Sequence, residues 1–383
     1  MKTRAAVLYG TGQPWTVEEI ELDPPGPGEV LVKTAYAGLC HSDEHLVTGD
    51  MAPPPELLEL LPGGSMFPMV GGHEGAGVVL EVGAGVTKVA AGDHISCSFV
   101  PACGICPPCA QGMQNLCDLG ARTFGGGMIT DDTYRAHTTS AQDLNMMAKL
   151  GTFAEHMVLA DASVIKVEPD LPLDAVCLVS CGVATGYGSA VNRAEVKAGD
   201  TVVVVGCGGI GSNAVQGAKA AGAANVIAVD PVPFKQEKAM EFGATHAVSS
   251  MEEAMPLVND LTWGRMANAT ILTPGVLYGD FIQKGMDLTG KGGTVVATAV
   301  APMDQHQVDL DLAFMTLSQK ELKGTIFGSA SPNARIPELL MLYRQGKLKL
   351  DELITRRYAL DEINQGYQDM KDGKNIRGII AFD

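Results

Sequence analysis

Residues 201–230 read TVVVVGCGGIGSNAVQGAKAAGAANVIAVD, and this stretch decides the fold. The β-branched run 201–205 is typical of a strand that is buried on both faces. A turn with four glycines comes next, at Gly206, Gly208, Gly209 and Gly211. An Ala-rich, helix-forming stretch follows, and a second apolar run, 226–229, ends on Asp230. Strand, glycine turn, helix and strand in this order predict an α/β fold with a doubly wound parallel sheet.

The same turn has the features of a dinucleotide site. The first glycine permits a tight turn, the middle ones let backbone N–H groups approach a pyrophosphate, and Gly211 lets the helix pack on the sheet. The helix N-terminus faces the phosphates with its positive dipole end. Asp230 can accept hydrogen bonds from the ribose hydroxyls of NAD and would repel a 2′-phosphate, so we predict NAD rather than NADP. Glycines that only mark a tight turn are the alternative, which the flanking strand, helix and acid disfavour.

Composition narrows the class of protein. A length of 383 residues predicts two domains, and 46% hydrophobic with 19% charged residues is typical of globular proteins. The net charge of −17 argues against a nucleic-acid partner. No apolar run reaches membrane-spanning length and the first residues lack a signal-peptide core, so we expect no membrane partner and a cytoplasmic location. Nine cysteines in such a chain indicate metal ligands or thiols before disulfides.

Four cysteines form the densest metal signature of the chain. They follow the spacing C-x₂-C-x₂-C-x₇-C, at Cys103, Cys106, Cys109 and Cys117. Four thiolates on one short lobe suit a closed, tetrahedral structural zinc site, which has no open position for a reaction. A four-cysteine iron–sulfur cluster and a chance group of free thiols are the alternatives.

The rest of the chain gives a coarser prediction. Short apolar runs with Pro/Gly turns predict an antiparallel, barrel-like N-terminal domain. A short helix is expected at 56–61, a last strand of the parallel sheet at 321–328, and a helix at 337–345. The closing strand, IRGIIAF, is expected to rejoin the first domain, so that the cofactor domain is an insertion.

Two polar segments and one cysteine stand apart from these elements. The first, 40–45, packs a thiol, two imidazoles, a hydroxyl and two carboxylates into six residues. The second places His73 and Glu74 between glycines, where packing alone does not favour them. Cys181 follows the segment LPLDAVCLVS, which predicts a helix beginning near Pro172. For His73 alone, a hydrogen-bonded core histidine is the alternative.

Together these motifs resemble the zinc-containing medium-chain alcohol dehydrogenases, in the order and approximate spacing of that family and over essentially the whole chain. The resemblance implies a GroES-like, β-rich catalytic domain and a Rossmann NAD-binding domain. It places the catalytic domain at 1–182, with a structural zinc lobe at about 97–120. The Rossmann domain then covers 183–327, and 328–383 returns to the catalytic domain.

The resemblance also assigns two zinc ions per chain. Cys40, His73 and Cys181 become the ligands of a catalytic zinc, and the four-cysteine lobe holds the structural zinc. Two thiolates and one imidazole leave the fourth tetrahedral position open, as catalytic zinc requires. Glu74 becomes the nearby acid that influences this open position.

Further roles concern the proton and the cofactor. Ser42 matches the hydroxyl that takes the alcohol proton, and His45 passes that proton to solvent through the cofactor ribose. The alternative for Ser42 is a plain turn residue, and the alternative for His45 is a solvated surface imidazole. For Lys235 and Arg377 the alternative is a solvated surface charge. Phe99 matches an aromatic residue of the substrate pocket. The resemblance gives cofactor-binding roles to His41, Thr185, Gly206, Gly208, Gly209, Ile210, Gly211, Asp230, Lys235 and Arg377.

Within the family, LCHSDEHLVTGD and SCGVATGYGSAVNRAEVKAGD are most similar to the actinobacterial nicotinoprotein alcohol dehydrogenases. Members of that group retain NAD and pass electrons to N,N-dimethyl-4-nitrosoaniline or to a mycofactocin-type redox carrier. The resemblance thus implies a zinc-dependent oxidoreductase that transfers a hydride between a primary alcohol and NAD, with an alcohol or aldehyde as substrate. It also implies a homodimer or homotetramer. S-(hydroxymethyl)glutathione dehydrogenase is the alternative in the same class, and a non-catalytic zinc- and nucleotide-binding protein is the alternative outside it.

Overall fold

In the computed structural model, six parallel strands between 201 and 324 form one sheet, in the order β13-β12-β11-β14-β15-β16. Every neighbouring pair in this sheet is parallel. This confirms the predicted doubly wound sheet. The strands are β11 (Thr201–Val205), β12 (Asn225–Val229), β13 (His246–Val248), β14 (Ala267–Leu272), β15 (Thr289–Ala297) and β16 (Glu321–Gly324).

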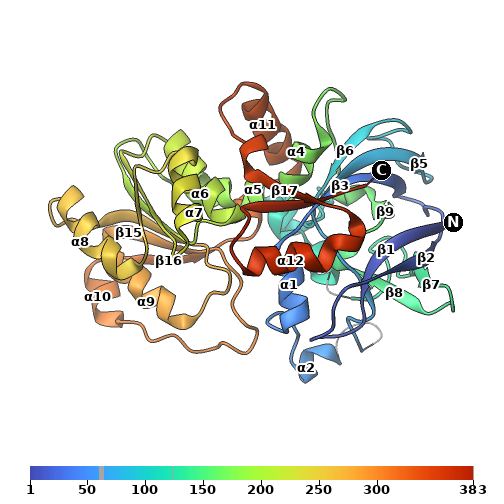
Figure 1. The fold of residues 1–383 in the computed structure, drawn as a ribbon, viewed down its shortest axis with the longest axis horizontal. Helices are drawn as coiled ribbons and strands as arrows, with labels where there is room; N and C mark the ends of the chain where they lie inside the picture. Colours follow the sequence, from blue (N-terminus) through green and yellow to red (C-terminus); the bar gives the residue numbers. More distant parts are fainter. Residues whose placement is uncertain (60–63, 124, 383) are drawn as a thin grey trace. The chain divides into compact units, whose positions relative to one another are not determined.

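Helices cover both faces of this sheet. In Figure 1, α6 and α7 lie on one side of it and α8 and α9 lie on the other. Valine and isoleucine side chains of the strands are almost fully buried beneath them, as predicted for strands covered on both faces. The helices of this unit are α5 (Gly182–Gly188), α6 (Gly209–Ala220), α7 (Pro233–Phe242), α8 (Met251–Leu261), α9 (Gly279–Leu288) and α10 (Leu312–Leu317), with a π-helix at Ser189–Arg193.

The structure describes residues 1–59, 64–123 and 125–382, and these form two units. The second unit, just described, comprises Gly182–Ala330 and Gln345–Lys349. The first comprises Met1–Cys181, Ser331–Arg344 and the described chain from Leu350 onward. The domain bounds given above remain a prediction.

Strands build most of the first unit. Five of its described strands form a closed barrel, β1-β2-β7-β8-β4. They are β1 (Lys2–Leu8), β2 (Thr16–Leu22), β4 (Met69–Val70), β7 (Ala136–Thr138) and β8 (Asp143–Met146). The barrel therefore joins strands from the first 70 residues with β7 and β8 from the segment 136–146.

A second sheet of the first unit has the order β10-β6-β5-β3-β18-β17, and β9 also pairs with β3. The closing strand of the chain, β18, rejoins the first unit, as predicted, and runs antiparallel to β3 there. Strand pairing thus joins residues near the two ends of the chain. These strands are β3 (Glu29–Gly38), β5 (Gly75–Val82), β6 (His94–Cys97), β9 (His156–Ala160), β10 (Val164–Lys166), β17 (Ile354–Tyr358) and β18 (Arg377–Ala381).

The described helices of the first unit are mostly short. Only α11 and α12 are longer than eight residues, and α4 begins after Pro172, as predicted. The helices are α1 (His41–Thr48), α2 (Pro55–Leu58), α3 (Pro107–Ala110), α4 (Leu173–Leu178), α11 (Pro332–Arg344) and α12 (Ile363–Lys371). No helix in the described part of the chain is long and apolar enough to cross a membrane.

Three predicted elements differ from the structure. The strand expected at 321–328 ends at Gly324, because Phe327, Gly328 and Ser329 have positive φ angles that extended backbone does not adopt. The helix expected at 337–345 begins earlier, at Pro332, where a proline in the first turn is tolerated. The helix expected at 56–61 is α2, and its predicted end, 60–61, lies outside the described residues.

Candidate active site and metal centres

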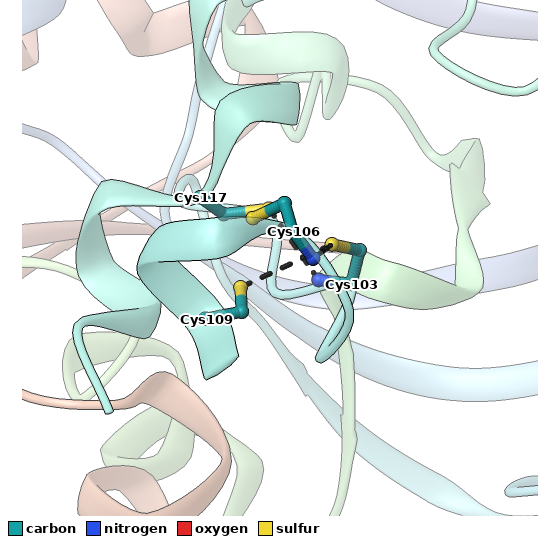
Figure 2. A group of neighbouring side chains, drawn as sticks. All are labelled: Cys103, Cys106, Cys109 and Cys117. Atoms are coloured by element: carbon teal, nitrogen blue, oxygen red, sulfur yellow. Dashed lines mark hydrogen bonds between the residues drawn. The ribbon is translucent and has the colours of Figure 1, made fainter. Parts of the chain in front are cut away.

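The four-cysteine lobe brings its sulfur atoms together around one point (Figure 2). All four lie within 4.8 Å of one another, and the pairs Cys103–Cys109 and Cys106–Cys117 are both 3.9 Å apart. Zinc–sulfur bonds of 2.3 Å place the sulfurs of a tetrahedral site about 3.8 Å apart. The lobe therefore fits one tetrahedral ion, whereas an iron–sulfur cluster, with several metal atoms, spreads its thiolates more widely.

Backbone N–H groups support the thiolate form in this lobe. The N–H groups of Cys106 and Cys103 donate to the sulfurs of Cys103 and Cys117, each at 3.4 Å. The N–H of Ile105, with burial opposing it, lowers the pKa of Cys103 to about 7. Burial raises the pKa of Cys109 to about 12 and also raises that of Cys117. The short loops therefore orient the sulfurs and favour the thiolate at Cys103, whereas burial opposes it at Cys109 and Cys117.

A second cluster lies in the first unit and is fully buried. Cys40 precedes α1, His73 and Glu74 follow β4, and Cys181 follows α4. Their four ligand atoms lie within 4.8 Å of one another. The structure thus assembles three segments that are far apart in sequence, and the cluster has the two thiols and one imidazole typical of catalytic zinc.

A buried carboxylate fixes the imidazole of this cluster. Asp43 Oδ2 lies 2.9 Å from Nδ1 of His73, and Asp43 Oδ1 accepts the N–H of Gly72 at 2.9 Å. Nε2 of His73 is buried and has no hydrogen-bond partner among the described residues. Burying a nitrogen that has no hydrogen-bond partner costs free energy. The position of Nε2 is therefore better explained if His73 is a metal ligand than if it is a hydrogen-bonded core histidine.

Tight packing places His73 at this position. Gly72 has a φ of +88°, and a Cβ there would lie 2.4 Å from Oγ1 of Thr152 and 2.7 Å from the backbone N of Phe153. Only glycine fits this close backbone approach. The glycine before the histidine therefore serves the turn that aims the imidazole at the two thiols.

The charges of the cluster depend on one another. A hydrogen bond from Cys181 lowers the pKa of Cys40 well below its usual value, and the same bond raises that of Cys181. Burial disfavours the imidazolium of His73, but Asp43 and Cys40 outweigh it and raise the pKa. Burial raises the pKa of Glu74 to about 7, although the Arg377 guanidinium opposes this.

Helix α1 carries the polar residues that follow Cys40. Ser42 Oγ lies 3.8 Å from Sγ of Cys40. His45 lies three residues further on the same helix face, and its ring is 6.2 Å from that of His41. The alternative that His45 is a solvated surface imidazole is wrong, because this residue is only 3% exposed.

Phe99 packs edge-on against His73 with ring centroids 5.7 Å apart, which places this aromatic ring beside the cluster.

The glycine turn of the second unit has the backbone geometry that was predicted. Gly206 has a φ of +88°, and a Cβ on Gly211 would lie 1.8 Å from the carbonyl oxygen of Gly206. A Cβ on Gly208 would meet nothing within 4 Å. The turn is therefore tight where the chain crosses itself and open at Gly208, just before α6 begins, where an anion can approach.

Three further residues of the second unit were predicted to bind the cofactor: Asp230, Lys235 and Thr185. Asp230 Oδ2 accepts the N–H of Cys207 at 2.8 Å, which ties the acid at the end of β12 to the glycine turn. Lys235, on α7, has no ion pair in the part of the chain that the structure describes. The hydroxyl of Thr185 is buried and unpartnered among the described residues, so it can serve a ligand. These groups fit the predicted NAD.

Arg377 belongs to the first unit and is 4% exposed. Its Nη2 contacts the Glu74 carboxylate and donates to the carbonyl of Leu39 at 3.1 Å. The alternative of a solvated surface charge is thus wrong for this residue. The prediction that it binds the pyrophosphate stays a prediction.

Two carboxylates of this region were not predicted as site residues. Asp43 contacts His73, which lies 30 positions later in the sequence. The spacing of residues within one segment does not reveal such a contact. Asp50 Oδ2 lies 3.1 Å from Nδ1 of His45. The sequence signal that could have found Asp50 is Gly49, which ends α1 and turns the chain back toward the histidine.

Comparison with known proteins adds the family. Residues 26–169 match the model of the alcohol dehydrogenase GroES-like domain, and residues 209–345 match that of the zinc-binding dehydrogenases. The chain is 53% identical to the NDMA-dependent alcohol dehydrogenase of Amycolatopsis methanolica, over 99% of both chains. It is 37% identical to the S-(hydroxymethyl)glutathione dehydrogenase of Photobacterium damsela subsp. piscicida, over the full length of both.

Among solved structures, the benzyl alcohol dehydrogenase of Acinetobacter calcoaceticus superposes with a TM-score of 0.89 at 29% identity, with full coverage of both chains. This likeness extends over both units and confirms the predicted GroES-like and Rossmann-type folds. Together with the identity over the whole chain, these matches show that the protein belongs to the zinc-dependent medium-chain alcohol dehydrogenase family.

Proposed function

We propose that this enzyme is a nicotinoprotein that oxidises primary alcohols with an NAD that it retains and that an external redox carrier reoxidises. The 53% identity to an NDMA-dependent alcohol dehydrogenase over the whole chain carries this proposal. The alternative, S-(hydroxymethyl)glutathione dehydrogenase, is supported by more distant relatives, at 37% and 35% identity.

In this proposal Cys40, His73 and Cys181 hold a catalytic zinc. The buried, unpartnered Nε2 of His73 between two thiols supports this ligand set. When bound, zinc acts as a Lewis acid that favours ionisation of the alcohol, and NAD accepts the hydride. Glu74 is the nearby acid of this site, and the lobe of Cys103, Cys106, Cys109 and Cys117 holds the structural zinc.

The chain's own residues bind the reactants and handle the proton. We assign the Ser42 hydroxyl as the group that takes the alcohol proton and His45 as the base that receives it, since both lie on one face of α1. Phe99 lines the substrate pocket in this proposal, supported by its contact with His73. The cofactor-binding residues are His41, Thr185, Gly206, Gly208, Gly209, Ile210, Gly211, Asp230, Lys235 and Arg377.

We also infer that two copies pair through the free edge of the parallel sheet. Strand β16 is the last in the sheet order, and the adjoining α10 exposes apolar side chains: Leu312 is 67% exposed, Phe314 65% and Leu317 83%. A groove of about 260 Å³, lined in part by Met286, Phe314 and Met315, lies beside them. An exposed apolar patch beside an edge strand is typical of an interface, so a homodimer, or a tetramer built from it, would cover this surface.

One preparation tests the function. The desalted protein is denatured, and NAD(H) and zinc are counted in the same sample. We expect close to one NAD(H) and about two zinc ions per chain, and primary-alcohol oxidation with N,N-dimethyl-4-nitrosoaniline without added NAD. Zinc without nucleotide would contradict NAD retention, and a turnover that requires glutathione with formaldehyde would favour the alternative.

A further inference from the structure

The imidazole of His45 contacts a carboxylate. Nδ1 of His45 lies 3.1 Å from Oδ2 of Asp50. The histidine side chain is 4% exposed, whereas that of Asp50 is 23% exposed. A buried imidazole is thus joined to a carboxylate that reaches solvent.

The end of α1 holds this carboxylate in place. Gly49 has a φ of +92°, and the N–H groups of Gly49 and Met51 both donate to the carbonyl of His45, at 3.0 and 3.1 Å. The chain therefore folds back over its own last turn. Thr48 Oγ1 donates to the same Asp50 Oδ2 at 2.6 Å, so the carboxylate has a second anchor besides the histidine.

The contact decides which nitrogen of His45 carries a proton. The hydrogen bond from Thr48, with a further one from His45, lowers the pKa of Asp50, so this group is a carboxylate near neutral pH. A carboxylate only accepts hydrogen bonds, and Nδ1 of His45 must then be the donor. In the neutral imidazole Nε2 is then the nitrogen that can act as a base.

We propose that Asp50 is a positioning residue for proton transfer, which holds His45 as the Nδ1–H tautomer and so leaves Nε2 as the atom that accepts a proton. This rests on the proposed function, in which His45 receives the proton that leaves the alcohol O–H bond. The proton binds the Nε2 lone pair and converts the neutral imidazole to the imidazolium, while Asp50 stays ionised. A solvent base then removes one proton and restores the neutral ring.

Two variants separate this role from a general loss of charge. Asp50→Asn keeps the shape but removes the charge, and Asp50→Glu restores a carboxylate. Glu56→Gln, on the exposed face of α2, is the matched control, because it removes the same charge without touching His45. For the complete enzyme we expect Asp50→Asn to lower kcat for a primary alcohol by roughly 10- to 100-fold at pH 7, with a small change in KM. Asp50→Glu should recover part of the loss, and Glu56→Gln should change nothing.

A double variant tests whether Asp50 acts through the histidine. In a His45→Gln background, Asp50→Asn should lower kcat little further, because the group that it positions is gone. An equal loss in both backgrounds, or an unchanged kcat in Asp50→Asn, would overturn the proposal. Thermal melting of each variant identifies any that fail to fold. If Asp50→Asn fails to fold, Thr48→Val, which removes the second anchor of the Asp50 carboxylate, takes its place and should also lower kcat.

Nitrogen NMR of ¹⁵N-histidine-labelled holoenzyme reads the tautomer without any assay of activity. We expect His45 of the unchanged protein as the Nδ1–H form and a shift toward the Nε2–H form in Asp50→Asn. A wild-type protein in the Nε2–H form overturns the inference even if alcohol oxidation is normal. Absence of alcohol oxidation with the expected tautomer contradicts the proposed function instead, so the two failures are distinguishable.

Discussion

Asp43 Oδ2 lies 2.9 Å from Nδ1 of His73, and neither side chain is more than 3% exposed. The same carboxylate accepts the N–H of Gly72 through its other oxygen. The imidazole is therefore oriented by a group that is itself anchored to the backbone of the preceding residue. Carboxylates in this position orient metal-ligating histidines and raise their basicity.

Replacing Asp43 by Asn should therefore weaken the catalytic zinc and spare the structural one. We expect the zinc affinity of that site to fall about 10- to 100-fold. Zinc counted after dialysis against a chelator should drop toward one ion per chain. Cys109→Ser is the reciprocal control, because it should remove the structural zinc and spare the catalytic one. Retention of both ions in Asp43→Asn would contradict the role of Asp43 in orienting a zinc ligand.

Two glycines of one turn should respond differently to alanine. A Cβ on Gly211 would lie 1.8 Å from the carbonyl oxygen of Gly206, so Gly211→Ala should destabilise the fold by roughly 1–3 kcal/mol. A Cβ on Gly208 meets nothing, so Gly208→Ala should fold normally but hinder the approach of the pyrophosphate. Thermal midpoints and NAD(H) content of the two variants test this, and normal NAD(H) content in Gly208→Ala would contradict the phosphate role.

The sequence predicts local motifs of this protein better than contacts between distant segments. The glycine turn and the four-cysteine lobe are local patterns, and their geometry matches the expectation because neighbouring residues determine it. Asp43 was missed because its contact with His73 joins distant segments. The bidentate ion pair between Arg135 and Glu29 spans 106 positions and was not predicted for the same reason. Such pairings depend on the tertiary fold, which spacing alone does not reveal.

Lys149 should make stability depend on pH. Its Nζ is buried and donates to the carbonyls of Gly125 and Gly126, both at 2.5 Å. Burial, with the nearby Arg122 charge, lowers the pKa of this lysine to about 8, below the 10.5 of an unperturbed side chain. Between pH 8 and pH 10.5 the amine of Lys149 binds a proton more often in the unfolded chain than in the folded one, so the free energy of unfolding rises with pH. The contribution of Lys149 to stability is therefore largest above about pH 10.5 and is lost as the pH falls toward 8.

The test compares the protein with Lys149→Met over this range. The difference in thermal midpoint, wild type minus variant, should rise from pH 8 to pH 10, because only the wild type carries the buried titrating amine. Lys347→Met, at an exposed lysine, is the control and should give a nearly constant difference. A difference that is flat or falls for Lys149→Met would contradict this account.

The exposed face of α10 gives the last prediction. Leu317 is 83% exposed beside the free edge strand β16, and a carboxylate placed there would have to lose its water in any interface over this surface. We expect Leu317→Glu to weaken self-association at least about ten-fold, measured by sedimentation velocity across a dilution series. Trp263→Glu is the matched control, because Trp263 is equally exposed, at 86%, but lies outside α10 and β16. Equal weakening in both variants, or none in Leu317→Glu, would mean that the copies associate through another surface.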